Sequence, residues 1–292
     1  SHVVHAPATS NAPDVPSFWG DDALAGWQHV INTVHGAGGM MAPQLWHVGA
    51  VRNPRTDWLP PMPWDAPSGL SRPGKPFCDP MTDGAIADTI AAFAKAAGAA
   101  KRLGFDCIEL HGAHGYLIDQ FLQSSTNIRD DEYGGSIENR ARLLLQIVDA
   151  FIEVWGAGRV GVHLAPRGDS HDMGDADPLA TFGYVVEQLD QRNVAFIFTR
   201  EYEAEDSLQP KLRPKFKGAW IANEKLTPDS AKRILATEQA DAVAFGLAYI
   251  ANPDLFERLE NDLPLNQVQF DTLYGPSAEG YTDYPVFEQL EA

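Results

Sequence analysis

Apolar positions along the chain follow two alternating patterns, and their alternation predicts the fold class. Ile86, Ile90, Phe93 and Ala97 recur every three or four residues, which places them on one face of a helix. A short continuous apolar run follows at residues 105–110 and is typical of a buried strand. Further runs of this kind occupy residues 40–46, 160–164, 194–198, 220–222 and 242–245. Because helical patterns flank each run, we expect an α/β fold with a parallel sheet.

The number of strand–helix units indicates an incomplete barrel. Six units can be counted, with a first helix at residues 22–35, whereas a TIM (β/α)8 barrel has eight. Residues 1–5 are a candidate end of one further strand. We therefore expect a single α/β barrel domain over residues 1–292, built from about six β/α units and the end of another strand. The long connections at residues 53–83 and after residue 263 are expected to cap the face where the active site lies.

Helix starts and helix faces can also be identified. Thr227 before Pro228, and Asn252 before Pro253, each combine a capping side chain with a proline that suits the first helical position. An apolar stripe predicts the core-facing side of a helix that ends at Gly156. It consists of Leu144, Ile147, Val148, Phe151 and Trp155.

Composition and charge exclude several classes of function. The chain has 22 basic and 40 acidic residues, and its net charge of -18 disfavours nucleic acid and anionic membranes as partners. We find no apolar run of membrane-spanning length and no charged-then-apolar leader. Cys78 and Cys107, the only two cysteines, do not form a disulfide framework. These features predict a reducing, cytoplasmic location.

Candidate chemistry gathers after the run at residues 105–110. His111, His114 and Tyr116 are expected in the loop between this strand and the next helix, and parallel folds bind ligands at that edge of the sheet. The pair His-x-x-His by itself is equally compatible with a structural or a metal-binding role. Two imidazoles are too few for a closed zinc site, and no third ligand is obvious nearby.

Several separated motifs occur together in one known family. They are Gln-Leu-Trp-His-Val-Gly (44–49), His-Gly-Ala-His-Gly-Tyr (111–116), Asp-Gln-Phe-Leu (119–122) with Ser-Thr-Asn (125–127), Asp-Glu-Tyr-Gly-Gly-Ser (131–136) with Glu-Asn-Arg (138–140), Ile-Ala-Asn-Pro-Asp-Leu (250–255) and Gly-Tyr-Thr-Asp-Tyr-Pro (280–285). In this combination the chain resembles the old yellow enzymes over essentially all of its 292 residues.

The resemblance implies an FMN-dependent ene-reductase. FMN would be reduced by NADPH or NADH and reoxidised by a small electron-poor alkene, either an α,β-unsaturated carbonyl or a nitro compound. His111 and His114 would donate hydrogen bonds to the substrate oxygen, which favours hydride arrival at the β-carbon. Tyr116 would protonate the α-carbon, since a phenol with a pKa near ~10 remains protonated at neutral pH.

The same resemblance assigns residues to cofactor and pocket. Gln44 would bind the flavin pyrimidine edge, Trp46 would form a wall of the active site, and Tyr274 would line the substrate pocket. The FMN phosphate would lie near the ends of the last two strands, against Ala222, Asn223, Phe245, Gly246 and Leu247. No resident metal is expected.

Three departures from the family pattern affect the cofactor site. His163 stands where many relatives have an arginine near the flavin, and its contribution is expected to depend more strongly on pH. Leu247 replaces an arginine beside the phosphate, which predicts weaker FMN retention with compensation from backbone amides and Lys225. The family's N-terminal strand–helix–strand segment has no counterpart before residues 11–14, so a truncated, partly open barrel is expected.

Two other functions remain as alternatives, and the assembly state is open. One is a flavin-free barrel remnant that binds a ligand without redox chemistry. The other, weaker, is a metal-dependent hydrolase that uses His111 and His114. A homo-oligomer is among the expected states, because a partner would cover the open edge of an incomplete barrel.

Overall fold

A parallel sheet forms the centre of the computed structural model, which describes residues 2–3, 9–13, 15–52, 57–273 and 277–289. Seven strands pair in the order β1-β2-β5-β6-β7-β8-β9, and every pairing is parallel. Their bounds are β1 His2–Val3, β2 Gln44–Trp46, β5 Ile108–Gly112, β6 Val160–Leu164, β7 Phe196–Arg200, β8 Ala219–Asn223 and β9 Ala242–Val243. Strand β1 confirms the predicted further strand near the N-terminus.

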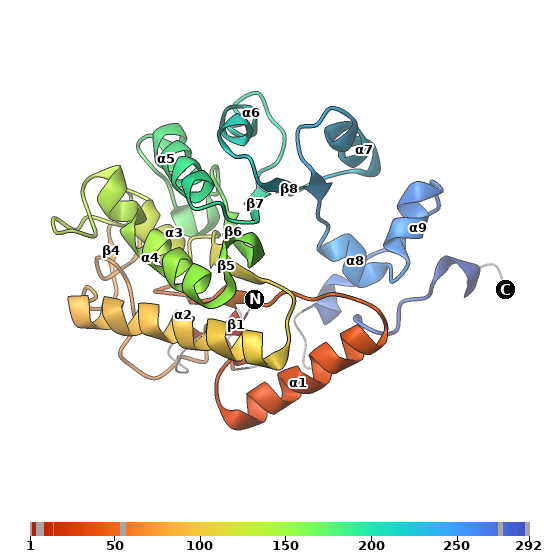
Figure 1. Ribbon diagram of the computed structural model, residues 1–292, viewed down its shortest axis with the longest axis horizontal. Helices are drawn as coiled ribbons and strands as arrows, with labels where there is room; N and C mark the ends of the chain where they lie inside the picture. The colour runs from red at the N-terminus through yellow and green to blue at the C-terminus, as the bar shows by residue number, and fades with distance from the viewer. Residues whose placement is uncertain (1, 4–8, 14, 53–56, 274–276, 290–292) are drawn as a thin grey trace.

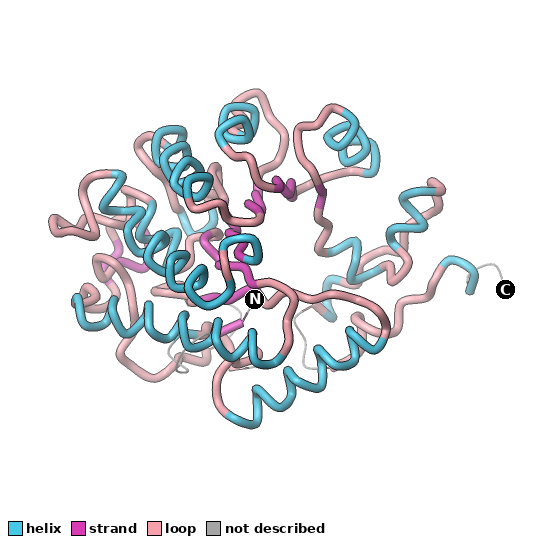
Figure 2. The backbone as a smooth tube through the Cα atoms, viewed as in Figure 1, coloured by secondary structure: helices cyan, strands magenta, loops and turns pink. Residues whose placement is uncertain are grey.

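The strands lie inside an arc of helices, as Figures 1 and 2 show. The helices are α1 Asp21–Gly36, α2 Asp83–Leu103, α3 Leu117–Leu122, α4 Ile137–Trp155, α5 Pro178–Gln191, α6 Gln209–Leu212, α7 Pro228–Ala236, α8 Leu247–Ala251 and α9 Leu255–Glu260. Short 3-10 segments occur at Ala157–Arg159, Ser170–Asp172, Arg213–Lys215, Phe270–Thr272 and Phe287–Gln289. Within the described residues, β1 and β9 do not pair with each other, so the TIM-type barrel is incomplete, as predicted.

The strands lie within a few residues of the predicted runs, and the differences at β5 and β2 have clear reasons. Strand β5 begins and ends later than expected, because its ladder with β6 continues to the pairs His111–His163 and Gly112–Leu164. His111 therefore lies on the strand itself and not in the following loop. Strand β2 is shorter than the predicted run 40–46, since pairing with β5 starts only at Gln44, one residue after Pro43.

The helix signals are confirmed in one case and wrong in another. Thr227 caps α7 through a reciprocal capping box with Ser230, and Pro228 is the first helical residue. Asn252, in contrast, does not start a helix. It ends α8, its side-chain amide donates to the carbonyl of Ala248 at 2.8 Å, and α9 begins only at Leu255.

The core lies between the sheet and the surrounding helices. All five residues of the predicted α4 stripe are buried. One of them, Phe151, packs against Phe93 of α2 with ring centroids 6.2 Å apart, and the indole N–H of Trp155 donates to the carbonyl of Ala97 at 3.0 Å. These contacts hold α2 and α4 together, and α4 in turn packs against β5 and β6, the two strands that carry His111 and His163.

The long connection before α2 contains structure that the sequence pattern did not predict. Strands β3 Leu70–Arg72 and β4 Lys75–Pro76 form an antiparallel hairpin within it. The connection is held against the end of β2, because Asp65 accepts a hydrogen bond from His47 at 3.1 Å. Among the helices that the structure describes, none is sufficiently long and apolar to cross a membrane.

Candidate active site

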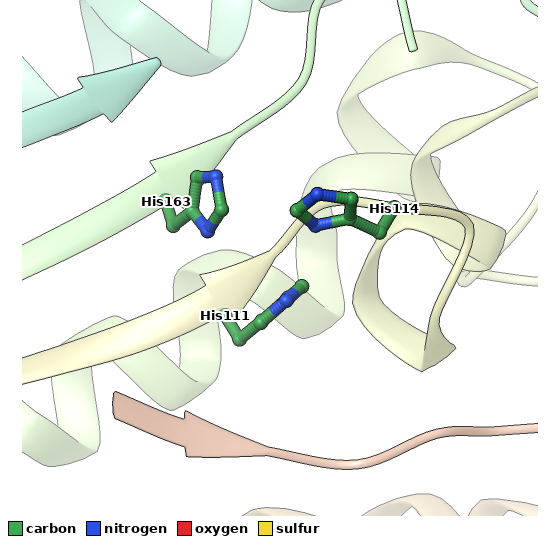
Figure 3. A group of neighbouring side chains, drawn as sticks. All are labelled: His111, His114 and His163. Carbon is green, nitrogen blue, oxygen red and sulfur yellow. The ribbon is translucent and has the colours of Figure 1, made fainter. Parts of the chain in front are cut away.

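Three imidazoles meet at the carboxyl ends of β5 and β6. His111 and His163 face each other in the ladder between these strands, and His114 comes from the loop that follows β5. Their ring centroids are 5.0 to 5.2 Å apart, and Figure 3 shows the three rings grouped together. The parallel register thus adds a third histidine to the pair that the sequence identified.

A buried carboxyl group shapes the loop that carries His114 and Tyr116. His114 has a φ of 60° and Gly115 a φ of 71°, so the chain turns sharply here through left-handed conformations. The N–H of Gly115 donates to Asp119 Oδ2 at 2.8 Å, and the Gln120 side chain donates to the carbonyl of Gly115 at 2.7 Å. Burial raises the pKa of Asp119 to about 7.

Tyr116 and Trp46 complete one wall of this group. The Tyr116 ring centroid is 5.3 Å from that of His111 and 4.8 Å from that of Trp46, in edge-to-face geometry. Tyr116 is the N-cap residue of α3, which fixes its backbone directly above the strand end. The structure therefore brings together the three residues predicted for catalysis and one of the two predicted for the substrate pocket. Tyr274, the other, lies outside the described residues.

Gln44 links β2 to the histidine group. Its side-chain N–H2 donates to His163 Nδ1 at 3.2 Å and also donates to the carboxylate of Glu109. Desolvation raises the pKa of Glu109 to about 7. No role was predicted for Glu109, although a signal was present: it is a charged residue in the middle of an apolar strand, two positions before His111 and therefore on the same face.

All three histidines are neutral donors at ordinary pH. Burial, with the nearby histidines as a second cause, lowers the pKa of His111 and of His163 well below the usual value. Burial also lowers the pKa of His114 to about 4, with Arg200 as the next cause. This argues against the expectation that His163 titrates near neutrality. For His111 the tautomer is also indicated, since its Nδ1 accepts the N–H of Ala113 at 3.3 Å and the proton is left on Nε2.

The same three histidines could hold a metal ion by their spacing, but the hydrogen bonds at two of them disfavour it. Their ligand nitrogens lie within 4.8 Å of one another. This spacing is compatible with zinc, since nitrogens bound tetrahedrally at about 2.0–2.1 Å from the ion are about 3.3 Å apart. However, the Nδ1 contacts of His111 and His163 leave N–H groups, not lone pairs, on Nε2 of both rings.

The predicted phosphate residues form a second group along the sheet. Ala222 and Asn223 end β8, and the Asn223 amide donates to the carbonyl of Ala244 at 2.7 Å. Phe245, Gly246 and Leu247 follow β9, the third strand beyond β6. Leu247 is 43% exposed and adds no charge to this group.

Lys225 is placed near this second group but is directed to an aromatic ring. Its Nζ lies 4.2 Å from the ring centroid of Tyr202, a cation–π contact. Arg200, at the end of β7, is paired with Glu224 at 2.8 Å. The compensating role expected for Lys225 stays a prediction.

The histidine group has the chemical character of a site that binds a polar, planar ligand. His163 Nε2, His114 Nδ1 and Trp46 Nε1 are buried and have no hydrogen-bond partner among the residues that the structure describes. Buried polar groups of this kind are costly unless a ligand or water satisfies them. Together with the Gln44 amide, these groups suit the alternating donors and acceptors at the edge of a flavin.

Comparisons with known proteins agree with this geometry. The model of a family described as the NADH:flavin oxidoreductase / NADH oxidase family matches residues 3–266. Flavin oxidoreductase hxnT of Emericella nidulans is 36% identical over an alignment of 308 residues, gaps included. The alignment covers 94% of this chain and 79% of that protein. The 12-oxophytodienoate reductase 1 of Oryza sativa subsp. japonica is 35% identical over an alignment of 309 residues, gaps included. The alignment covers 98% of this chain and 79% of that protein.

Solved structures give the same result at the level of the fold. A structure of morphinone reductase in complex with tetrahydroNAD matches with a TM-score of 0.92 and 36% identity, covering 100% of this chain and 85% of that chain. An old yellow enzyme homologue from Zymomonas mobilis matches with a TM-score of 0.90 and 33% identity, covering 98% of this chain and 84% of that chain.

Proposed function

Because the chain belongs to the NADH:flavin oxidoreductase / NADH oxidase family of old yellow enzymes, we propose that it reduces electron-poor alkenes. As a member of this family it is an NAD(P)H-dependent oxidoreductase with FMN as its cofactor. Retention of FMN by the purified protein, seen in its visible absorbance spectrum, is the observation that would exclude the flavin-free alternative. The proposed substrates are small α,β-unsaturated carbonyl or nitro compounds. The observation that carries the proposal is the convergence of His111, His114 and Tyr116 at one strand end.

When bound, FMN would supply hydride chemistry, with NAD(P)H as the reductant. His111 and His114 bind the carbonyl or nitro oxygen of the substrate through N–H groups, and so draw electron density away from the β-carbon. Because low pKa values keep both imidazoles neutral, they act as hydrogen-bond donors and not as proton sources. Trp46 restricts the position of Tyr116 by edge-to-face packing.

Tyr116 is proposed as the proton donor to the α-carbon. Its ring packs against both His111 and Trp46, so the phenol and the imidazole donor belong to one wall of the site. Gln44 and His163 are proposed to hold the pyrimidine edge of FMN. The phosphate is proposed to lie beside Ala222, Asn223 and the segment Phe245, Gly246 and Leu247.

The test of this function is Tyr116→Phe, studied by stopped-flow spectroscopy of the flavin in its two half-reactions. Reduction of FMN by NAD(P)H should be unchanged, and reoxidation by 2-cyclohexenone should be slowed by about 10²–10⁴-fold, the usual contribution of a positioned proton donor. Tyr133→Phe is the matched control, because this phenol donates to Gln146 at 3.1 Å and does not contact the histidines. Unchanged reoxidation in Tyr116→Phe would show that the proton comes from another group.

A further inference from the structure

Two hydrogen bonds join Glu109, Gln44 and His163 in series, with a defined donor and acceptor at each step. We propose that Glu109 is a positioning residue that acts through the Gln44 amide and holds His163 as the Nε2–H tautomer, so that His163 offers the cofactor a neutral donor. The inference rests on the proposed placement of the FMN pyrimidine edge beside Gln44 and His163. It assigns a role to a partly buried carboxyl group that the proposed mechanism does not otherwise use.

Glu109 determines which group donates and which accepts in this series of hydrogen bonds. Gln44 and Glu109 are directly paired in the ladder between β2 and β5, so their side chains leave the sheet side by side. An ionised carboxylate can only accept hydrogen bonds, and Gln44 Nε2 donates to it. The opposite orientation of the amide would place Gln44 Oε1 against a carboxylate oxygen in a poorly solvated position, which is unfavourable.

The second hydrogen of the same amide group is donated to His163 and so determines the tautomer of that imidazole. Gln44 Nε2 lies 3.2 Å from His163 Nδ1, and an amide nitrogen can only donate, so Nδ1 must accept. A neutral imidazole whose Nδ1 accepts carries its proton on Nε2. His163 Nε2 is buried and has no partner within the described part of the chain, so its N–H remains for a ligand.

Without the Glu109 carboxylate, no acceptor-only group would face the Gln44 amide from β5. Gln44 could then turn its Oε1 toward His163 and accept from Nδ1–H, which would direct the Nε2 lone pair toward the ligand. A lone pair repels the carbonyl oxygen and N1 of the flavin pyrimidine edge, whereas an N–H binds them. The carboxylate would thus allow a neutral histidine to take the donor role that a permanently charged arginine has in many relatives.

The test measures the tautomer of His163 directly. Protein labelled with ¹⁵N in histidine is examined by NMR without FMN at about pH 8.5, well above the pKa of about 7 of Glu109. The His163 signals are assigned by their loss in His163→Gln. The wild-type protein should show one tautomer, with the proton on Nε2. Glu109→Gln keeps the shape of the side chain but can donate as well as accept, and should give a mixture of the two tautomers.

Glu201→Gln is the matched control, since Glu201 is a buried carboxylate that follows β7 and accepts from the N–H of Leu208. This variant should retain the wild-type tautomer. A His163 proton on Nδ1 in the wild-type protein, or an unchanged tautomer in Glu109→Gln, would overturn the inference. If Glu109→Gln does not fold, Gln44→Leu replaces it, with a mixture of tautomers expected and a retained single Nε2–H form counting against the inference.

FMN titration then separates this inference from the proposed site. The dissociation constant measured by quenching of flavin fluorescence should rise about two- to threefold in Glu109→Gln, because only the fraction of molecules with the His163 proton on Nε2 offers the donor to FMN. It should not change in Glu201→Gln. A mixture of tautomers with unchanged FMN affinity would mean that the role of Glu109 stands but FMN lies elsewhere, whereas an unchanged tautomer contradicts the role itself.

Discussion

Asp119→Asn removes a buried ionisable group from beneath the catalytic loop. In the wild-type protein this carboxyl accepts the N–H of Gly115 at 2.8 Å and the side-chain amide of Gln123 at 3.0 Å. It is fully buried, and its pKa is raised to about 7. The variant keeps an acceptor oxygen of the same shape but cannot ionise. We therefore expect the change to alter how the stability of the protein depends on pH.

The magnitude follows from the difference between the folded and unfolded pKa values. The unfolded chain releases the Asp119 proton near pH ~4, and the folded protein holds it until about pH 7. Between these values the folded state binds more protons, so the free energy of unfolding falls as pH rises, by about 1.4 kcal/mol per pH unit. Above the folded pKa the contribution is constant. From about pH 5 to pH 8 the wild-type protein should lose roughly 2–3 kcal/mol relative to the variant.

Equilibrium unfolding in urea, followed by tryptophan fluorescence, measures this difference. Both proteins are compared without FMN, so that cofactor binding does not add to the pH dependence. Glu109, which also has a raised pKa, is present in both proteins and cancels. Asp131→Asn serves as a control, because the hydrogen bond from Arg129 lowers the pKa of Asp131 and its contribution changes only in acid. A difference between wild type and Asp119→Asn that is constant over this pH range would refute the reasoning.

Two further predictions concern ligands. Because the pKa of His114 is lowered to about 4, and those of the other two site histidines are also lowered, binding of a phenol measured by flavin difference spectroscopy should not change between about pH 6 and pH 8 in the double variant Glu109→Gln/Asp119→Asn, which lacks the two carboxyl groups whose pKa is about 7. An inflection near the usual histidine pKa would contradict the neutral donors. Leu247→Arg should lower the FMN dissociation constant several-fold by adding a charged donor beside the proposed phosphate position. Equal affinity in fluorescence titrations would place the phosphate elsewhere.

The main helices and the strands of the parallel sheet could be predicted from the sequence because they depend on local patterns. The α4 stripe from Leu144 to Trp155 repeats with the period of a helix, and the strand Val160–Leu164 is a continuous apolar run with turn residues on both sides. Errors occurred where the signal was short or depended on pairing. The hairpin of β3 and β4 is too short to give a pattern. Asn252 precedes a proline, as a residue that begins a helix often does, but its side chain donates to Ala248 of the preceding helix.

The sequence by itself also determined the family and the catalytic candidates, because His111, His114 and Tyr116 lie within one short motif whose order along the chain is informative. Only the tertiary structure decided how these residues are charged and oriented. The pKa values of the histidines depend on burial, and burial is a property of the packed molecule. The link from Glu109 through Gln44 to His163 joins three strands, and no local pattern records which side chains face each other across a sheet.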